Sequence, residues 1–197
     1  MGSFIYKIEI LQDKANKMTT ELHKLAGEEF IKRFMDGERD FSHIELQSSF
    51  KFNQHPAYNE FQKYLQSINL KDSPLIFIGS QAFGVDFSSL YLPFTKAYDA
   101  TLIASKFVDC LLHNSILVNA NVSHAKFHLS DLRHVDWYNT TMGYTNFQKS
   151  DLRESKNFGY ARGIESAKFS FNRMDQGDFI VIQHTSKKKT LERELLK

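Results

Sequence analysis

Every fifth residue is apolar over a long central stretch of this chain, and this period constrains the fold more than any other feature. From Phe87 to Leu152 all fourteen such positions are apolar, and thirteen of the fourteen residues two positions earlier are small. Side chains two apart on an extended strand point the same way. We therefore expect each repeat to bury one large central residue and one small companion, and to turn a corner with the rest. The central residues are Phe87, Leu92, Ala97, Leu102, Phe107, Leu112, Leu117, Val122, Phe127, Leu132, Trp137, Met142, Phe147 and Leu152.

A second regularity links every fourth repeat. Phe and Leu each recur at a spacing of twenty, as Phe87, Phe107, Phe127 and Phe147 and as Leu92, Leu112, Leu132 and Leu152. A coil of four five-residue faces brings each series into one stack, with about 4.8 Å between hydrogen-bonded strands. The sequence therefore predicts an all-β solenoid with internal ladders of Phe and Leu.

These repeats resemble the pentapeptide-repeat family, whose motif is a small residue, Asp or Asn, Leu or Phe, and two variable residues. The motif is clearest in Ala120-Asn121-Val122, Ser130-Asp131-Leu132, Val135-Asp136-Trp137, Thr145-Asn146-Phe147 and Ser150-Asp151-Leu152. The resemblance implies a right-handed quadrilateral parallel β-helix. The handedness comes from the resemblance, because a period alone has no hand.

The phase of the repeat predicts the domain organisation. We expect an N-terminal segment over residues 1–39, the solenoid over 40–182, and a C-terminal tail over 183–197 that can form a short helix. Residues 20–35 have helical periodicity, with Thr20 as the N-cap and Gly37 after the end. An open solenoid end exposes unpaired backbone and core, so this helix is expected to be a cap.

Two interruptions are expected within the solenoid. Helical spacing of apolar residues near 53–66 predicts an inserted helix, and loss of phase near 157–166 predicts a loop that bulges from the coil. After that loop the repeat resumes two residues out of phase. We therefore expect Phe169 to continue the Phe ladder and Met174 the Leu ladder, with Phe179 to Ile182 as a closing strand.

Charge and cysteine content limit the function classes. The chain has 25 Lys and Arg against 23 Asp and Glu, a balance too even to predict a nucleic-acid or membrane partner. A single cysteine, Cys110, excludes an intramolecular disulfide and any multi-cysteine metal site. No apolar run approaches the roughly 18 residues that span a bilayer, and the N-terminus lacks the pattern of a signal peptide. We predict a cytoplasmic protein.

No motif predicts catalysis. A phosphate-binding glycine loop, a metalloprotease histidine pair and a nucleophile elbow cannot be traced in the sequence. The repeat serines and threonines are expected to face inward, and the five-residue register places His124 and His128 on different faces. We therefore predict that the protein is not an enzyme and has no cofactor, no metal site and no catalytic residue.

One set of outward residues is a candidate interaction surface. Tyr98, Ile116, Val118 and Tyr138 are expected on one face, and contiguous exposed apolar residues usually mark a contact. The alternative is that the N-terminal segment, the inserted helix or the tail covers them.

A second outward set is a candidate basic column. His113, Arg133 and Arg153 lie twenty residues apart and could together hold an anionic group. The alternative is a solvated face, because Asp131 and Asp151 offer local partners.

We predict a non-catalytic scaffold for protein–protein interaction, whose partner is an unidentified protein or a second copy of the chain in a homodimer. The alternative is a DNA-mimicking modulator of a type II topoisomerase (gyrase), the role that the resemblance to quinolone-resistance members implies. A DNA mimic needs an acidic surface, whereas residues 85–156 contain seven acidic and seven basic residues. The same neutrality disfavours direct binding of nucleic acid.

Overall fold

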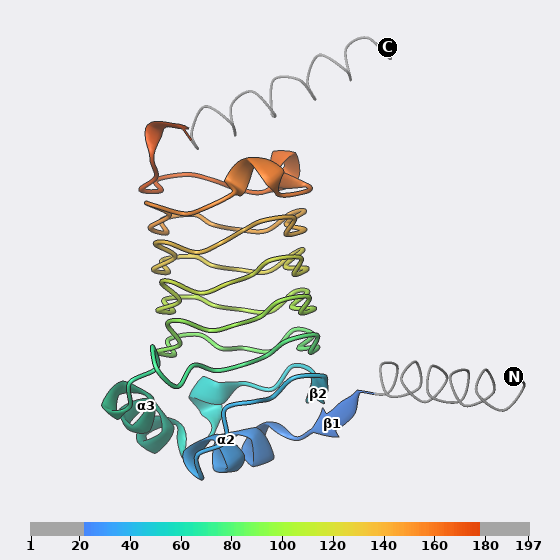
Figure 1. The fold of residues 1–197 in the computed structure, drawn as a ribbon, viewed down its shortest axis with the longest axis vertical. Helices are drawn as coiled ribbons and strands as arrows, with labels where there is room; N and C mark the ends of the chain where they lie inside the picture. Colours follow the sequence, from blue (N-terminus) through green and yellow to red (C-terminus); the bar gives the residue numbers. More distant parts are fainter. Residues whose placement is uncertain (1–21, 178–197) are drawn as a thin grey trace, which may run out of the picture.

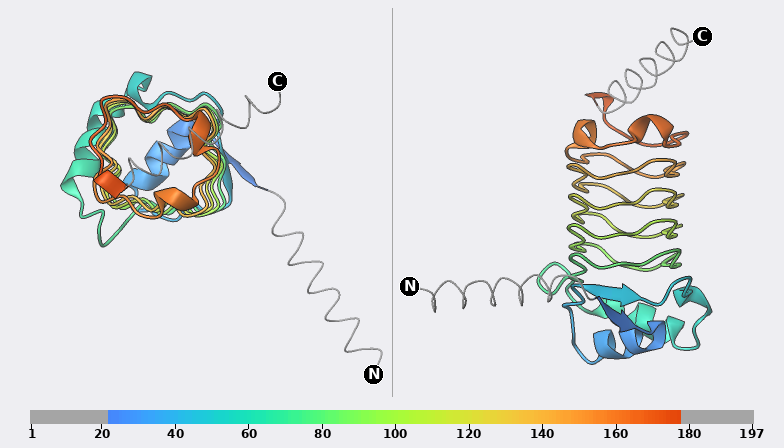
Figure 2. Two further views of the ribbon diagram at one scale, coloured as in Figure 1. Left: turned by 90° about the horizontal axis from the view of Figure 1, so that it is seen from above. Right: turned by 90° about the vertical axis from the view of Figure 1, so that its right-hand side faces the viewer.

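The structure is a computed structural model that describes residues 22–177, and most of this range is a β-helix solenoid. Parallel bridges join residues twenty apart, as in Asp86 to Lys106, Lys106 to Lys126 and Lys126 to Asn146. Figure 1 shows the coils stacked along one axis, and Figure 2 shows a four-sided outline when the chain is seen along that axis. The predicted twenty-residue coil and β-helix solenoid are confirmed.

Four faces result, and each is defined here by one stack of central residues. Face 1 contains Phe77, Ala97, Leu117 and Trp137; face 2 contains Ala82, Leu102, Val122 and Met142; face 3 contains Phe87, Phe107, Phe127 and Phe147; face 4 contains Leu92, Leu112, Leu132 and Leu152. All of these side chains are buried. The core is therefore the interior of the coil.

Left-handed backbone makes the corners between the faces. From Ser89 to Glu154 the second residue after every central residue has a φ between 55° and 63°, although none of these residues is glycine. A positive φ at the second central residue of a turn is that of type II geometry, and it usually favours Gly or Asn. The backbone N–H of most of these residues donates to a carbonyl of the next coil, as from Asp99 to Val118 O at 3.0 Å. Hydrogen bonds between coils thus stabilise the left-handed backbone of these corners, although their residues are not glycine.

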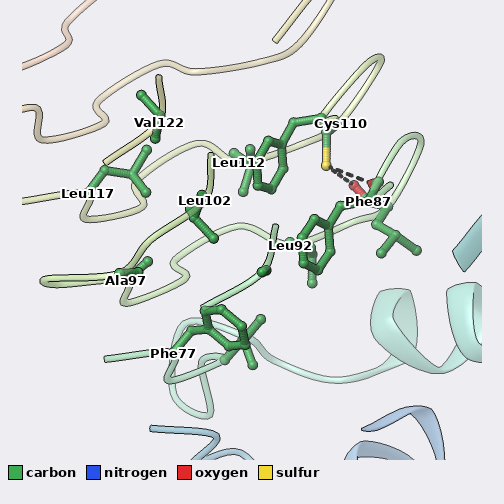
Figure 3. Close-up of a cluster of buried hydrophobic side chains, with 14 of the residues drawn as sticks. Phe77, Phe87, Leu92, Ala97, Leu102, Cys110, Leu112, Leu117 and Val122 are labelled. Atoms are coloured by element: carbon green, nitrogen blue, oxygen red, sulfur yellow. Dashed lines mark hydrogen bonds between the residues drawn. The ribbon is translucent and has the colours of Figure 1, made fainter. Parts of the chain in front are cut away.

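A continuous ladder of phenylalanine rings fills face 3. Ring centroids lie 5.2 Å apart from Phe52 to Phe87, 5.0 Å from Phe87 to Phe107, 4.9 Å to Phe127 and 5.3 Å to Phe147. Phe169 stacks 5.1 Å beyond Phe147, as the phase shift predicts. Figure 3 shows Phe87 in the interior together with Leu92, Ala97 and Leu102, one from each of the other faces. The ladder therefore runs the length of the solenoid.

The small companions bind the coils together through hydrogen bonds. Thr140 Oγ1 donates to Leu117 O and Thr145 Oγ1 to Val122 O, each at 2.7 Å, and Ser130 and Ser150 make the equivalent bond. Each hydroxyl thereby reaches the carbonyl of a central residue in the preceding coil. Buried polar groups need such partners, which explains why Ser and Thr recur at this inward position.

The Asp or Asn of the motif has a local role. Asn121 Oδ1 accepts from Ser123 N at 3.0 Å, Asp136 Oδ1 from Tyr138 N at 3.0 Å, and Asn146 Oδ1 from Gln148 N at 2.9 Å. Each side chain caps the N–H two residues later, which begins the turn. The motif is therefore a turn signal as well as a strand signal.

The N-terminal end differs from the sequence prediction. The helix α2 is Gly27–Met35, not 20–35, because Leu25 belongs to the strand β1, His23–Leu25. This strand pairs in parallel with β2, Ile44–Leu46, and extends face 2 downward. A side chain at Gly27 would lie 2.2 Å from the Phe50 ring, so close packing favours glycine where α2 begins. Thr20, expected as the N-cap, lies outside the described residues.

The face of α2 that carries Phe30, Ile31 and Phe34 is buried against the first coil. Phe30 lies 4.3 Å from Phe41 and 5.6 Å from Phe52, measured between ring centroids. In Figure 2 the helix lies within the outline of the coil when seen along the axis.

The inserted helix α3, Tyr58–Ser67, follows the short 3-10 helix η1, Phe52–Gln54. Its apolar residues Phe61 and Leu65 are fully buried, and Phe61 packs 5.6 Å from Phe34. Gln62 Oε1 accepts from Tyr91 N at 3.2 Å, and its Nε2 donates to Ser89 O at 2.6 Å. The Gln62 side chain therefore makes the hydrogen bonds to this backbone that a neighbouring coil would otherwise make.

The interruption after Lys156 is not the outward loop that the sequence suggests. It forms two 3-10 helices, η2 (Phe158–Tyr160) and η3 (Ile164–Ser166), and both Phe158 and Ile164 are buried. Phe158 lies 5.7 Å from Trp137. The bridges Thr141 to Arg162 and Asn146 to Lys168 account for the two extra residues. The expected closing strand at 179–182 and the tail at 183–197 lie outside the described residues.

Candidate functional site

Three of the four residues of the candidate interaction surface lie in one column on face 1. Tyr98, Val118 and Tyr138 each follow a central residue, and Tyr160 extends the column, with its ring 5.5 Å from that of Tyr138. We name these four residues the tyrosine column. Tyr138 is 48% exposed and Tyr160 66% exposed, whereas Tyr98 and Val118 are half-buried. The column is a strip of accessible aromatic and aliphatic surface parallel to the solenoid axis.

Ile116 lies beside the tyrosine column rather than within it. It occupies the bridge position of its repeat, where its neighbours in adjacent coils are Lys96 and Asp136. On the other side of the column, Asn119 Nδ2 donates to Asp99 Oδ1 at 3.0 Å, and Asn139 Nδ2 donates to Asn119 Oδ1 at 2.8 Å. Polar residues therefore border the column on both sides.

The described helices do not cover this column. The buried residues of α2 and α3 contact the first coil and each other at the N-terminal end. In Figure 1 both helices lie at that end of the stack, away from the coils that carry Val118 and Tyr138. Of the alternatives raised from the sequence, covering by α2 or by the inserted helix is therefore excluded.

Tyr160 and the Asn119 to Asn139 pair were missed by sequence reasoning, although the sequence carries a signal for the two asparagines. The two asparagines are twenty residues apart, whereas Tyr160 lies 22 residues after Tyr138, out of the repeat phase. The bridge from Thr141 to Arg162 shows that only one of the two extra residues has been inserted by Arg162, so the contact of Tyr160 with Tyr138 comes from the fold of η2 rather than from the repeat phase.

The candidate basic column on face 4 is brought together as expected, but its charges are compensated. Arg133 Nε and Nη2 donate to Asp131 at 2.9 and 2.7 Å, and Arg153 makes the same two contacts with Asp151 at 2.9 and 2.6 Å. Hydrogen bonds from Arg153 hold the pKa of Asp151 below its usual value. These pairs correspond to the solvated-face alternative rather than to a bare cationic ridge.

His113 contributes little charge to this column. Burial lowers the pKa of its imidazole, which favours the neutral form. Its Nδ1 lies 2.8 Å from Asn114 Nδ2, and its ring packs edge-on against Phe94 at 5.6 Å between centroids. These contacts make it a packed corner residue.

The remaining chemistry-bearing residues are separated. His124 stacks on Tyr144 at 5.1 Å between ring centroids on face 2, whereas His128 follows the Phe127 repeat on face 3. Cys110 is fully buried, and its Sγ lies 3.1 Å from Leu90 O (Figure 3).

Within residues 22–177, no three His, Cys, Asp or Glu side chains converge to hold a metal ion. None of the helices in that range is both long and apolar enough to cross a membrane.

Comparison with solved structures gives distant likenesses. A pentapeptide-repeat protein, Rfr23, from the cyanobacterium Cyanothece 51142 is 15% identical, covers 74% of this chain and 93% of its own, and has a TM-score of 0.30. A trypsin-treated variant of QnrB1, a plasmid-mediated fluoroquinolone resistance protein, is 14% identical over 74% and 79% of the two chains, with a TM-score of 0.29. HetL from the cyanobacterium Nostoc sp. strain PCC 7120 is 13% identical over 75% and 79%, with a TM-score of 0.19.

No curated protein matches this chain in sequence. The family model of pentapeptide repeats matches residues 98–133 with eight copies. Since the TM-scores are below 0.5, the repeats themselves carry the assignment. The bridges extend the same twenty-residue coil to both sides of the matched region. The chain therefore carries the pentapeptide repeats of this family over residues 98–133.

Proposed function

We propose that this protein is a non-catalytic scaffold that presents the tyrosine column on face 1 to a protein partner. The observation that supports this proposal is the exposure of Tyr138 and Tyr160 in line with Val118 and Tyr98. Tyrosine is enriched in protein interfaces because its ring buries a large area and its hydroxyl stays hydrated. The repeated backbone holds the column rigid, so little ordering entropy is lost on binding.

The polar borders suit an interface of this kind. Asn119 and Asn139 on one side, and Lys96 and Asp136 beside Ile116 on the other, supply donors and acceptors around an apolar strip. Interfaces commonly combine an apolar centre with a polar rim. The partner can be another protein or a second copy of this chain, and the experiment below distinguishes the two.

The test introduces a charge into the column. Val118→Glu should abolish partner capture from a lysate of the source organism, because a buried unpaired carboxylate is costly. Val108→Glu is the matched control, since Val108 occupies the equivalent half-buried position on face 3. Light scattering after size exclusion measures the oligomeric state of both variants. A homodimer lost only in Val118→Glu identifies the partner as a second copy.

The proposal is wrong if Val118→Glu captures the same proteins and has the same mass as the wild type. Loss of capture in both variants would equally count against face 1 as the contact surface. Circular dichroism of each variant checks that the solenoid remains folded.

The gyrase-modulating alternative receives less support. A DNA mimic needs accessible carboxylates, but those of Asp131 and Asp151 are paired with arginine and are only 16% and 18% exposed. The resemblance alone keeps this role in second place. A supercoiling assay with purified gyrase tests it directly: inhibition or protection by this protein would support the mimic, and no effect would count against it.

With the scaffold we propose three structural assignments. The coil is right-handed, which an experimental density map would read directly. Residues 22–39 form an N-terminal segment before a solenoid whose bridges begin at Asp40, and α2 serves as its cap. The contact of Phe30 with Phe41 supports the cap. Hydrogen exchange should then be slower in the Phe41 coil of the wild type than in Phe30→Glu, and equal rates would refute the cap.

A further inference from the structure

A groove of about 510 Å³ runs across several coils at the corner between face 3 and face 4. We name it the corner groove. Six charged residues line it: the cations Arg133, Lys149, Arg153 and Arg173 and the carboxylates Asp131 and Asp151. Leu111, Leu129 and Phe171 supply its apolar surface. The groove therefore combines charge and apolar contacts on a different part of the solenoid from the tyrosine column.

The carboxylates of the corner groove are largely hidden by their own arginines. Side-chain exposure is 16% for Asp131 and 18% for Asp151, but 44% for Arg133 and 46% for Arg153. Each carboxylate accepts both a backbone N–H and two guanidinium N–H bonds from the arginine two residues later. A ligand entering the groove thus meets the guanidinium groups before it meets the carboxylates.

Two further cations, Lys149 and Arg173, line the groove. Within the described part of the chain, neither Lys149 nor Arg173 forms an ion pair. Arg173 occupies the bridge position above Asp151, so the acidic column ends in a cation at the last described coil. With four cations against two carboxylates, the groove has a net charge of +2.

The apolar residues of the groove are unusually accessible. Phe171 is 88% exposed, Leu129 51% and Leu111 40%. Lys149 and Phe171 take the corner positions of successive coils above Leu129, since Leu129 N donates to Gln148 O and Lys149 N to Ser170 O. Cationic and apolar side chains therefore alternate along one edge.

We propose that the corner groove binds a short acidic segment of another protein that also carries large apolar side chains. Carboxylates of the segment pair with Lys149 and Arg173, and its apolar side chains contact Leu129 and Phe171. The lining residues from Leu111 to Arg173 belong to four successive coils, so the groove is about 14 Å long at 4.8 Å per coil, which fits about four extended residues. Charge complementarity steers such a segment to the groove and sets its orientation.

The same features disfavour a nucleic acid as the ligand. Asp131 and Asp151 recur along the groove and would lie beside a phosphate backbone, and Phe171 is the only aromatic ring among the lining residues. Binding of single-stranded nucleic acid needs a continuous cationic track with several stacking rings. A peptide can place its backbone amides, rather than charges, beside the aspartates.

The probe for this proposal is a fluorescein-labelled peptide, Glu-Leu-Glu-Glu-Phe-Glu, titrated with the full chain and followed by fluorescence anisotropy. Binding is expected to weaken as salt is raised, because exposed charges are screened. The double variant Lys149→Glu with Arg173→Glu should bind about tenfold more weakly or worse. Lys96→Glu with Lys156→Glu is the matched control, since it changes net charge equally on face 1, outside the groove.

Several outcomes would overturn the proposal. These are no binding of the peptide, equal weakening in the control, equal binding of an all-Glu hexapeptide, and tighter binding of a thymidine hexanucleotide. Circular dichroism tests whether the variants fold, and Lys149→Gln with Arg173→Gln replaces the charge reversal if it does not fold. Because no step uses the tyrosine column, failure of the Val118→Glu test leaves this proposal unaffected.

Discussion

The substitution Phe127→Ala tests whether the phenylalanine ladder stabilises the solenoid. Phe127 is fully buried between Phe107 and Phe147, with ring centroids 4.9 and 5.3 Å away, and Trp137 packs edge-on at 5.8 Å. Truncation of a buried Phe to Ala usually costs about 3–5 kcal/mol. Each lost aromatic pair adds about 0.5–1.5 kcal/mol to simple burial.

The upper part of that range is expected here. The bridges from Lys126 to Lys106 and to Asn146 fix the backbone on both sides of Phe127, so the coils cannot collapse into the cavity. We expect the free energy of unfolding to fall by about 4–5 kcal/mol, a large part of the roughly 5–15 kcal/mol of a typical domain. The loss should appear as a shift of the urea midpoint, followed by far-UV circular dichroism.

Two controls separate ladder packing from mere side-chain removal. Phe127→Leu retains most of the apolar volume and should cost less than about 2 kcal/mol. Phe171→Ala removes an 88% exposed ring and should change stability by less than about 0.5 kcal/mol. A loss below about 1.5 kcal/mol for Phe127→Ala, or one equal to that of Phe171→Ala, would refute the reasoning.

Two further predictions concern ionisable groups. Asp151→Asn should lower stability by less than about 1 kcal/mol at pH 7, because the pair with Arg153 is partly exposed. The pKa of Asp151 is lowered in the folded state. Its contribution to the free energy of unfolding is therefore present above the unfolded pKa of about 3.9 and is lost as pH falls through the folded pKa. If the urea midpoints of the wild type and Asp151→Asn differed as much at pH 2 as at pH 7, this prediction would be contradicted. Burial raises the pKa of the Cys110 thiol, so a disulfide reagent at pH 8 should label it only after unfolding, and rapid labelling of the native protein would show that the core opens.

Local periodicity made the repeating part of the fold predictable. The inward positions from Phe87 to Leu152 and the resumed phase at Phe169 depend on strands that alternate at a spacing of two and corners that recur at a spacing of five. When similar coils stack, these inward side chains pack on one another and form the core. The outward column of Tyr98, Val118 and Tyr138 follows from the same repeat, because these residues are twenty positions, or one coil, apart.

Only the tertiary structure decided what happens where the period breaks. Phe52 joins the ladder beneath Phe87 across 35 residues, because α3 leaves the coil and returns to pack on α2. Phe158 and Ile164 turn inward because the last coils still need core side chains, and Leu25 joins a strand because β2 has a free edge. The groove at the corner also depends on which arginine reaches which aspartate. The positions of these residues depend on contacts between segments that are distant in sequence, and a local period does not predict such contacts.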